Sequence, residues 1–138
     1  MTEYLETLNL IDLISEKHKE LRREIRTRWN NESLCDNKLH LISMLSIKKM
    51  TISEAARKMN LSRQAIHKFS KSMIEEGLIK IEDNKENSKE RLMTLTESGN
   101  NLYKELLEIK LKLEYSIEKK IGIDNFRTIK KLLQDSWL

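Results

Sequence analysis

Proline is absent from the 138-residue sequence, glycine occurs three times and cysteine once. Sandwiches, barrels and flexible interdomain linkers are rich in glycine and proline, so this composition argues against all three. A lone cysteine excludes an intrachain disulfide and suits a reducing compartment. No stretch approaches the roughly 18 consecutive apolar residues of a membrane span, and the N-terminus lacks a signal-peptide pattern. We therefore expect a cytoplasmic protein that does not associate with membranes.

The sequence also lacks the motifs of common catalytic and metal sites. It has no glycine-rich phosphate loop, nucleophile elbow or paired-carboxylate cleft. Cys35, Asp36 and His40 offer too few converging ligands for a metal. His18 lies on an apolar stripe, where a histidine of the core or of a dimer seam is commoner than a ligand. A redox role for Cys35 would need a positive setting, which the neighbouring Asp36 opposes. We therefore predict no enzyme activity, no cofactor and no metal.

What the sequence does contain is charge and helical periodicity. Hydrophobic residues make up 38% of the chain and charged residues 35%, which allows only a thin core for this length. Long helices with one apolar stripe each fit that balance, and such helices usually pack against a partner chain. The chain has no internal repeat, so we expect either one domain or one domain with attached helices.

Residues 51–77, TISEAARKMNLSRQAIHKFSKSMIEEG, predict two short helices joined by a tight turn at residues 60–61. Thr51 and Glu54 have the spacing of a capping box that begins the first helix, and Ser62 is placed to cap the second. Apolar residues recur along the second helix at three- and four-residue steps, which predicts one buried face: Ala65, Ile66, Phe69, Met73 and Ile74.

The opposite face of this second helix is basic, and no acidic residue occurs between Ser62 and Ile74. A basic face is often only a solvated surface, so the helix pair alone leaves that alternative open. The layout is also that of a helix-turn-helix whose second helix enters the major groove of DNA. The side chains on this face are Arg63, Gln64, His67, Lys68 and Lys71.

A β-hairpin is predicted directly after the second helix. Gly77 suits a left-handed helix cap, and residues 78–82 and 91–95 alternate as strands around the polar tip at 83–90. A hairpin in this position is a wing, with Lys85, Lys89 and Arg91 as its cations. Thr96 is then placed to cap a following helix.

The order of residues 51–56, 61–62, 76–79 and 95–99 resembles the MarR family of bacterial winged-helix regulators. The resemblance is close in the middle of the chain and covers the flanking helices only in length and pattern. It implies a homodimeric transcriptional regulator, typically a repressor. It also implies that a small apolar or aromatic effector could bind where the dimer helices meet the DNA-binding lobe, a region for which we name Trp29, Leu39 and Leu106 as candidate lining.

Two positions in the wing depart from that family. Where the family usually has Asp-x-Arg, this sequence has Asn87 and Lys89. Lysine lacks the planar fork of arginine and fits a narrow minor groove less well. We therefore expect little sequence preference from the wing.

The flanking segments predict long helices. We expect one helix over residues 2–29, a loop over 30–36, a helix over 37–47, a helix over 97–121 ended by Gly122, and a last helix capped by Asp124. We assign residues 1–30 and 97–138 to dimerisation and 31–96 to a winged helix-turn-helix DNA-binding domain. The predicted fold class is therefore mainly α with a small β-hairpin wing.

Charge is concentrated on the predicted DNA-binding domain. Residues 47–91 hold eleven Lys and Arg against seven Asp and Glu, an excess that equals the net charge of +4 of the whole chain. Ser62 and the adjoining amides are expected to hold a phosphate, while Arg63 or Lys68 reads guanine and Gln64 reads adenine. His67 is a further candidate for a base edge, and the remaining predicted contacts go to the backbone or through the wing: Lys71, Lys85, Lys89 and Arg91.

We therefore predict a sequence-specific regulator that binds double-stranded DNA as a homodimer at a pseudo-palindromic operator. The alternative is a winged-helix module for protein contact, replication or plasmid partition, in which the basic face is incidental.

Overall fold

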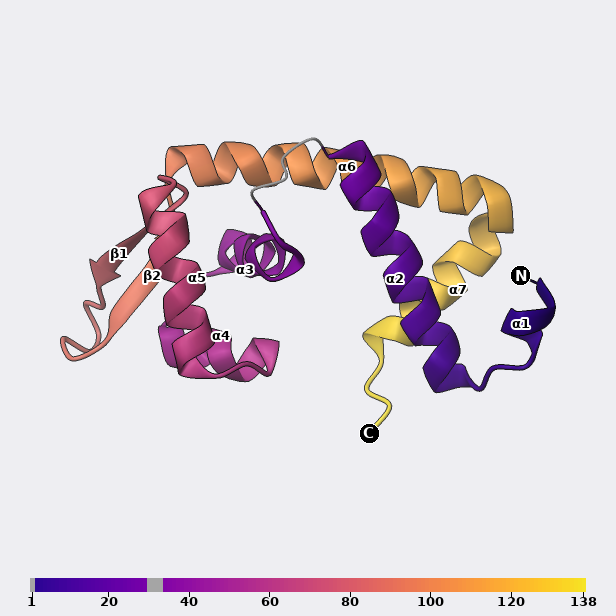
Figure 1. Cartoon of the computed structure of the whole chain (residues 1–138), viewed down its shortest axis with the longest axis horizontal. Helices are drawn as coiled ribbons and strands as arrows, with labels where there is room; N and C mark the ends of the chain where they lie inside the picture. The colour runs from indigo at the N-terminus through magenta and orange to yellow at the C-terminus, as the bar shows by residue number, and fades with distance from the viewer. Residues whose placement is uncertain (1, 30–33) are drawn as a thin grey trace.

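The computed structural model describes residues 2–29 and 34–138 of the chain. The described chain is mainly helical with one antiparallel hairpin, arranged along a long helix near its C-terminal end (Figure 1). The elements are α1 (Thr2–Glu6), α2 (Leu10–Arg28), α3 (Asp36–Ile47), α4 (Ile52–Met59), α5 (Arg63–Glu75), β1 (Ile79–Asp83), β2 (Arg91–Leu95), α6 (Glu97–Ile121) and α7 (Ile123–Gln134).

Helices α3, α4 and α5 and the hairpin form a winged-helix lobe beneath one end of α6, and α1, α2 and α7 lie towards its other end (Figure 1). We call α1, α2, α6 and α7 the arm. The hairpin pairs Ile79 with Leu95 at its base and Asp83 with Arg91 near its tip, and an isolated bridge joins Met50 to Met93. The lobe therefore has the winged-helix fold that the sequence predicts.

Thr51 and Ser62 cap the helices of the lobe as predicted, but the described contacts show only the Thr51 half of the predicted capping box. The Thr51 hydroxyl accepts a hydrogen bond from the Glu54 amide at 3.1 Å, and the Ser62 hydroxyl accepts one from the Ala65 amide at 3.0 Å. The Glu54 carboxylate forms an ion pair with Lys48, with Oε2 3.4 Å from Nζ. Thr51 therefore caps α4 while the Glu54 side chain pairs with a cation.

The core of the lobe is closed within one chain. The apolar sides of α3, α4, α5 and the hairpin converge on it, and burial of such side chains is the main source of folding free energy. The residues with no exposed surface in this core are Leu41, Ile42, Ala55, Ile66, Met73 and Met93. Ile74 was predicted to join them, but it is 42% exposed because it lies at the edge of the buried face in the last turn of α5.

The predicted single helix over residues 2–29 is wrong, because the structure divides it into α1 and α2. The side chain of Asn9 accepts a hydrogen bond from the Asp12 amide at 2.8 Å and caps α2. Asparagine side chains offer such local bonds in competition with a continuous helix. Spacing of apolar residues alone does not reveal this break.

The cap of the last helix also differs from the prediction. Gly122, with a φ of 90°, occupies the N-cap of α7, and Asp124 lies in the first turn. A carboxylate there is favoured by the positive end of the helix dipole. Asp124 therefore stabilises the start of α7 without capping it.

The arm buries fewer of its apolar side chains than the lobe does. One buried cluster, formed by Ile25, Leu34, Leu39 and Leu106, joins α2 and α6 to α3. Helix α7 contributes no buried residue in the described chain. No helix within residues 2–29 and 34–138 is both long and apolar enough to cross a membrane.

Candidate nucleic-acid interface

Helix α5 has one buried face and one exposed face. Ile66 and Met73 are fully buried and Ser70 is 4% exposed, which fixes the rotation of the helix against the lobe. The predicted DNA-contacting side chains of this helix and its N-cap are all exposed: Ser62, Arg63, Gln64, His67, Lys68 and Lys71. Residues three and four apart are neighbours on a helix, so these side chains form one continuous surface. The structure brings them together as predicted.

The cations on this surface have no acidic partners among the described residues. The ion pairs of the lobe use Lys38, Lys48, Lys49 and Arg91. In the part of the chain that the structure describes, no carboxylate forms an ion pair with Arg63, Lys68 or Lys71. Their charges are therefore available to an external anion.

The N-terminal end of α5 adds backbone donors to this surface. A helix leaves its first amides without partners inside the helix, and its dipole favours an anion there. The Ser62 hydroxyl satisfies the Ala65 amide, while its own hydrogen and the first-turn amides remain available for phosphate oxygens. This end of α5 and the hairpin tip both point away from α6 (Figure 1).

The wing has no net positive charge, although three of its cations were predicted to contact DNA: Lys85, Lys89 and Arg91. Arg91 faces Asp83 across the hairpin, with Nε 3.8 Å from Oδ1 and both side chains exposed. Residues 79–95 hold four cations and four carboxylates, so the hairpin is neutral overall. Lys85 and Lys89 are exposed at the tip, where the Asn87 side chain closes the turn by accepting from the Lys89 amide at 3.1 Å.

The structure reveals a cationic junction of α2, α3 and α6 that the sequence did not predict. Lys110 of α6 is half-buried and its Nζ lies 3.2 Å from Ser43 Oγ of α3. Burial lowers the pKa of Lys110, and the charge of Arg22 lowers it further. Burial likewise lowers the pKa of His40, helped by the charges of Arg22, Lys110 and His18.

His18 was predicted to pack in the core or at a dimer seam; it is exposed in the single chain, so it is not a core residue. Cys35 is also exposed and precedes α3. Within the described residues no group of three or more His, Cys, Asp and Glu could hold a metal ion.

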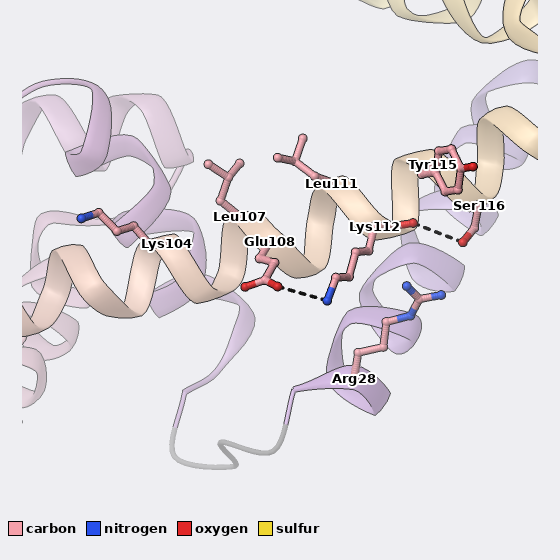
Figure 2. Close-up of a pocket in the computed structure, with 8 residues that line it drawn as sticks. All are labelled: Arg28, Lys104, Leu107, Glu108, Leu111, Lys112, Tyr115 and Ser116. Atoms are coloured by element: carbon pink, nitrogen blue, oxygen red, sulfur yellow. Dashed lines mark hydrogen bonds and ion pairs between the residues drawn. The ribbon is translucent and has the colours of Figure 1, made fainter.

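A hollow of about 600 Å³ runs along α6 beside the end of α2 (Figure 2). Its lining comprises Arg28, Lys104, Leu107, Glu108, Leu111, Lys112, Tyr115 and Ser116. The residues named above as candidate effector lining do not border this hollow, because Trp29, Leu39 and Leu106 pack together in the buried cluster.

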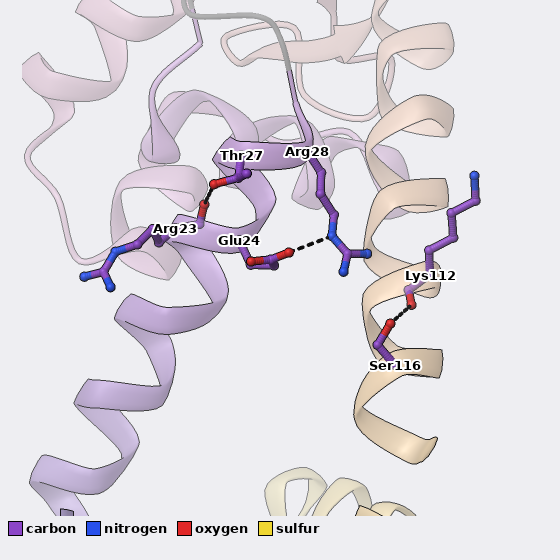
Figure 3. Close-up of polar contacts among 6 residues, drawn as sticks. All are labelled: Arg23, Glu24, Thr27, Arg28, Lys112 and Ser116. Carbon is purple, nitrogen blue, oxygen red and sulfur yellow. Dashed lines mark hydrogen bonds and ion pairs between the residues drawn. The ribbon is translucent and has the colours of Figure 1, made fainter. Parts of the chain in front are cut away.

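The polar contacts around this hollow stay within single helices (Figure 3). Arg28 pairs with Glu24 at 3.0 Å inside α2, and the Ser116 hydroxyl donates to the Lys112 carbonyl at 3.2 Å inside α6. None of the contacts drawn there joins α2 to α6. The apolar row of α6 beside them, with Leu111 53% and Tyr115 57% exposed, is left open in the single chain.

Comparison with known proteins identifies the fold. No family model and no curated protein matches the sequence. Solved structures match over nearly the full length. Apo wild-type MarR from E. coli is 15% identical, with 92% of this chain and 96% of that chain covered and a TM-score of 0.77.

Two further structures agree. A mutant of MepR from S. aureus is 13% identical, with 91% of this chain and 94% of that chain covered and a TM-score of 0.74. The transcriptional regulator BldR from Sulfolobus solfataricus is 15% identical, with 96% of this chain and 98% of that chain covered and a TM-score of 0.71. The chain therefore has the winged-helix fold of MarR-family regulators, and the predicted fold class is confirmed.

Proposed function

We propose that this chain is a sequence-specific DNA-binding transcriptional repressor. The observation that carries the proposal is the exposed face of α5, which presents Arg63, Lys68 and Lys71 with no acidic partner in the described chain. Such cations neutralise phosphates and supply most of the affinity for duplex DNA. The fold supports the same function, since similar structures include a regulator and a protein described as a multiple antibiotic resistance repressor.

Each exposed residue of α5 has a proposed role. Ser62 and the first-turn amides hold a phosphate, Arg63 or Lys68 reads guanine, and Gln64 reads adenine from the major groove. His67 contacts a base edge, and Lys71 contacts the backbone. The wing adds sequence-independent affinity through Lys85, Lys89 and Arg91.

The functional unit we propose is a two-fold dimer formed through the arm. Leu10 is 60%, Ile11 70% and Leu133 61% exposed in the single chain, and apolar surface on this scale favours a partner. A symmetric dimer would cover it and place two copies of α5 about one DNA turn, ~34–36 Å, apart. Residues 1–30 and 97–138 would then serve dimerisation, and 31–96 would bind DNA.

The junction of α2, α3 and α6 is where we place an effector, as the family resemblance implies. Arg22, His40 and Lys110 each lie within one helical turn of a residue of the buried apolar cluster. This combination would suit a small aromatic molecule with a negative charge. Benzoate should then release the protein from its operator at concentrations where benzyl alcohol does not, and equal effects of the two would contradict the charge requirement.

A winged-helix module for protein contact, replication or partition is the competing function. It would use the same lobe without reading a sequence. Binding to a random duplex, measured at low and moderate salt, addresses this alternative first. A module of that kind would show no binding, or binding without sequence preference that is lost once salt weakens the phosphate contacts.

The decisive test is selection of bound duplexes from a random pool by the full chain. The proposal predicts recovered sites with inverted half-sites about 10–10.5 base pairs apart, as a two-fold dimer requires. Recovery of unrelated sequences at moderate salt would overturn sequence-specific recognition. Recovery of single half-sites would overturn the dimer.

A further inference from the structure

The C-terminal end of α5 is held by a partly buried ion pair with another helix. Lys38 Nζ, in the first turn of α3, lies 2.6 Å from Glu76 Oε1 and 2.7 Å from Ser72 Oγ. The Ser72 hydroxyl also donates to Glu76 Oε1 at 3.0 Å. The Lys38 side chain is only 12% exposed, whereas Lys48 and Arg91 in other ion pairs of the lobe are 60% and 69% exposed.

Both charges of this pair occupy helix ends that disfavour them. Lys38 stands near the positive N-terminal end of α3, and Glu76 is the C-cap of α5, at its negative end. Neither charge therefore stabilises its own helix. Lys38 and Glu76 are the oppositely charged partners of one another, so the pair serves the contact between α3 and α5.

The same end of α5 is fixed a second time by the start of α6. The Thr96 hydroxyl donates to the Gly77 carbonyl at 2.6 Å, and the Thr96 amide donates to the Leu78 carbonyl at 3.0 Å. Gly99 lies so close that a Cβ atom there would stand 2.0 Å from the Leu78 oxygen. The chain leaving α5 is therefore held between α3 and α6.

The first turn of α3 also contacts the arm. Asp36 Oδ1 lies 3.1 Å from Arg26 Nη2 of α2. Asp36 and Lys38 thus connect the same turn to a helix of the arm and to the helix that we propose enters DNA. This turn is placed where it can set the angle between the two.

We propose that Lys38 is a positioning residue for DNA recognition, a role that rests on the function proposed above. By holding Ser72 and Glu76, it fixes the end of α5 opposite the DNA-entering end. The exposed side chains near Ser62 then meet base edges at a set angle. Phosphate contacts tolerate a change of angle better than bidentate base contacts do. Loss of Lys38 therefore reduces discrimination between sequences more than it reduces affinity for DNA in general.

The test compares binding of full-length variants to the selected operator and to a scrambled duplex, well below their melting temperatures. We expect Lys38→Met to raise the Kd for the operator about tenfold, as when one base contact per half-site is lost, and to change the Kd for the scrambled duplex less than about twofold. Lys112→Met is the matched control. It removes the same charge from an exposed pair with Glu108 on α6 and should change neither Kd.

A double variant separates positioning from net charge. Lys38→Met with Glu76→Gln restores the net charge of the wild type but not the contact, so its discrimination should remain reduced. Recovery of wild-type discrimination in this double variant, or equal weakening on both duplexes by Lys38→Met, would overturn the positioning role. If Lys38→Met does not fold, Glu76→Gln alone breaks the same ion pair and should show the same loss.

The two proposals fail in different ways. A wild-type protein that does not distinguish the operator from the scrambled duplex overturns the proposed function, and the role of Lys38 with it. A wild-type protein that distinguishes them, with a folded Lys38→Met variant that does so equally well, overturns the role of Lys38 alone.

Discussion

The lobe and the arm are both built mainly from helices, yet the lobe buries most of its apolar side chains and the arm leaves many of its own exposed. Ile66 of α5 and Leu41 of α3 are fully buried, whereas Leu132 and Leu133 of α7 are 51% and 61% exposed. The lobe surrounds its core with three helices and a hairpin. The arm sets α7 against one end of α6 and leaves its apolar stripe open. The lobe therefore closes its core within one chain, and the exposed stripe of the arm supports the dimer that we propose above.

The largest effect is expected when a charged residue is introduced into the exposed apolar stripe of the arm. Leu133→Glu should place an unpaired carboxylate in each half of the dimer interface and weaken dimerisation by about 3–5 kcal/mol, or more than about 100-fold. Sedimentation equilibrium measures this dissociation constant. Lys131→Gln, on the opposite side of α7, makes the same change in charge and should leave it unaltered. Two equally stable dimers would contradict the placement of the interface.

The closed core of the lobe makes the complementary prediction. Leu41→Ala should lower the free energy of unfolding by about 2–5 kcal/mol, because the cavity left in a closed core cannot collapse fully. Ile47, at the end of α3, is 84% exposed, so Ile47→Ala should cost less than about 0.5 kcal/mol. Urea denaturation at one fixed protein concentration checks both. Similar losses for the two variants would show that the lobe is not packed as described.

Within the lobe, α5 should contribute sequence preference, whereas the neutral wing should contribute only affinity that does not depend on sequence. Arg63→Ala should relax sequence preference at one position per half-site and cost ~1–3 kcal/mol for each such contact. Lys85→Ala removes the same charge from the wing. It should lower the affinity for every duplex by about the same factor, and this factor should be smaller than the loss that Arg63→Ala causes on the operator. Competition between operator variants measures the difference. Unchanged discrimination by Arg63→Ala would refute its assignment to a base edge.

The smallest effect is expected at the junction of lobe and arm. Because burial and nearby positive charge lower the pKa of His40, the folded chain favours its neutral form. The stability that neutral His40 contributes is present above its ordinary pKa of 6.5 and is lost as the pH falls through 6.5 towards the lower folded-state pKa. The urea midpoint of the wild type should therefore fall more than that of His40→Gln between about pH 7.5 and 5.5. Parallel curves would contradict this.

Local signals in the sequence predicted much of the lobe. The caps at Thr51, Ser62 and Thr96 involve partners three residues away, so spacing alone reveals them. The exposed face of α5 followed from its buried face in the same way. The break at Asn9 was missed because the helical spacing of apolar residues continues on both sides of it. The hydrogen bond from the Asp12 amide to the Asn9 side chain, which caps α2, leaves no mark on that spacing.

Contacts between distant segments could not be predicted. Lys38 and Glu76 are 38 residues apart, and each looks like an ordinary charge at an unfavourable helix end until the two helices are packed. Lys110 similarly gains its half-buried setting from α2 and α3, which its own helical spacing does not show. Such residues need the tertiary structure.

The most direct test of the central claim is an anisotropy titration of the selected operator with the wild type and with the triple variant Arg63→Ala/Lys68→Ala/Lys71→Ala. If the exposed face of α5 binds DNA, the triple variant should remain folded and dimeric while its Kd rises more than about 100-fold. A triple variant that binds the operator as tightly as the wild type would contradict the account.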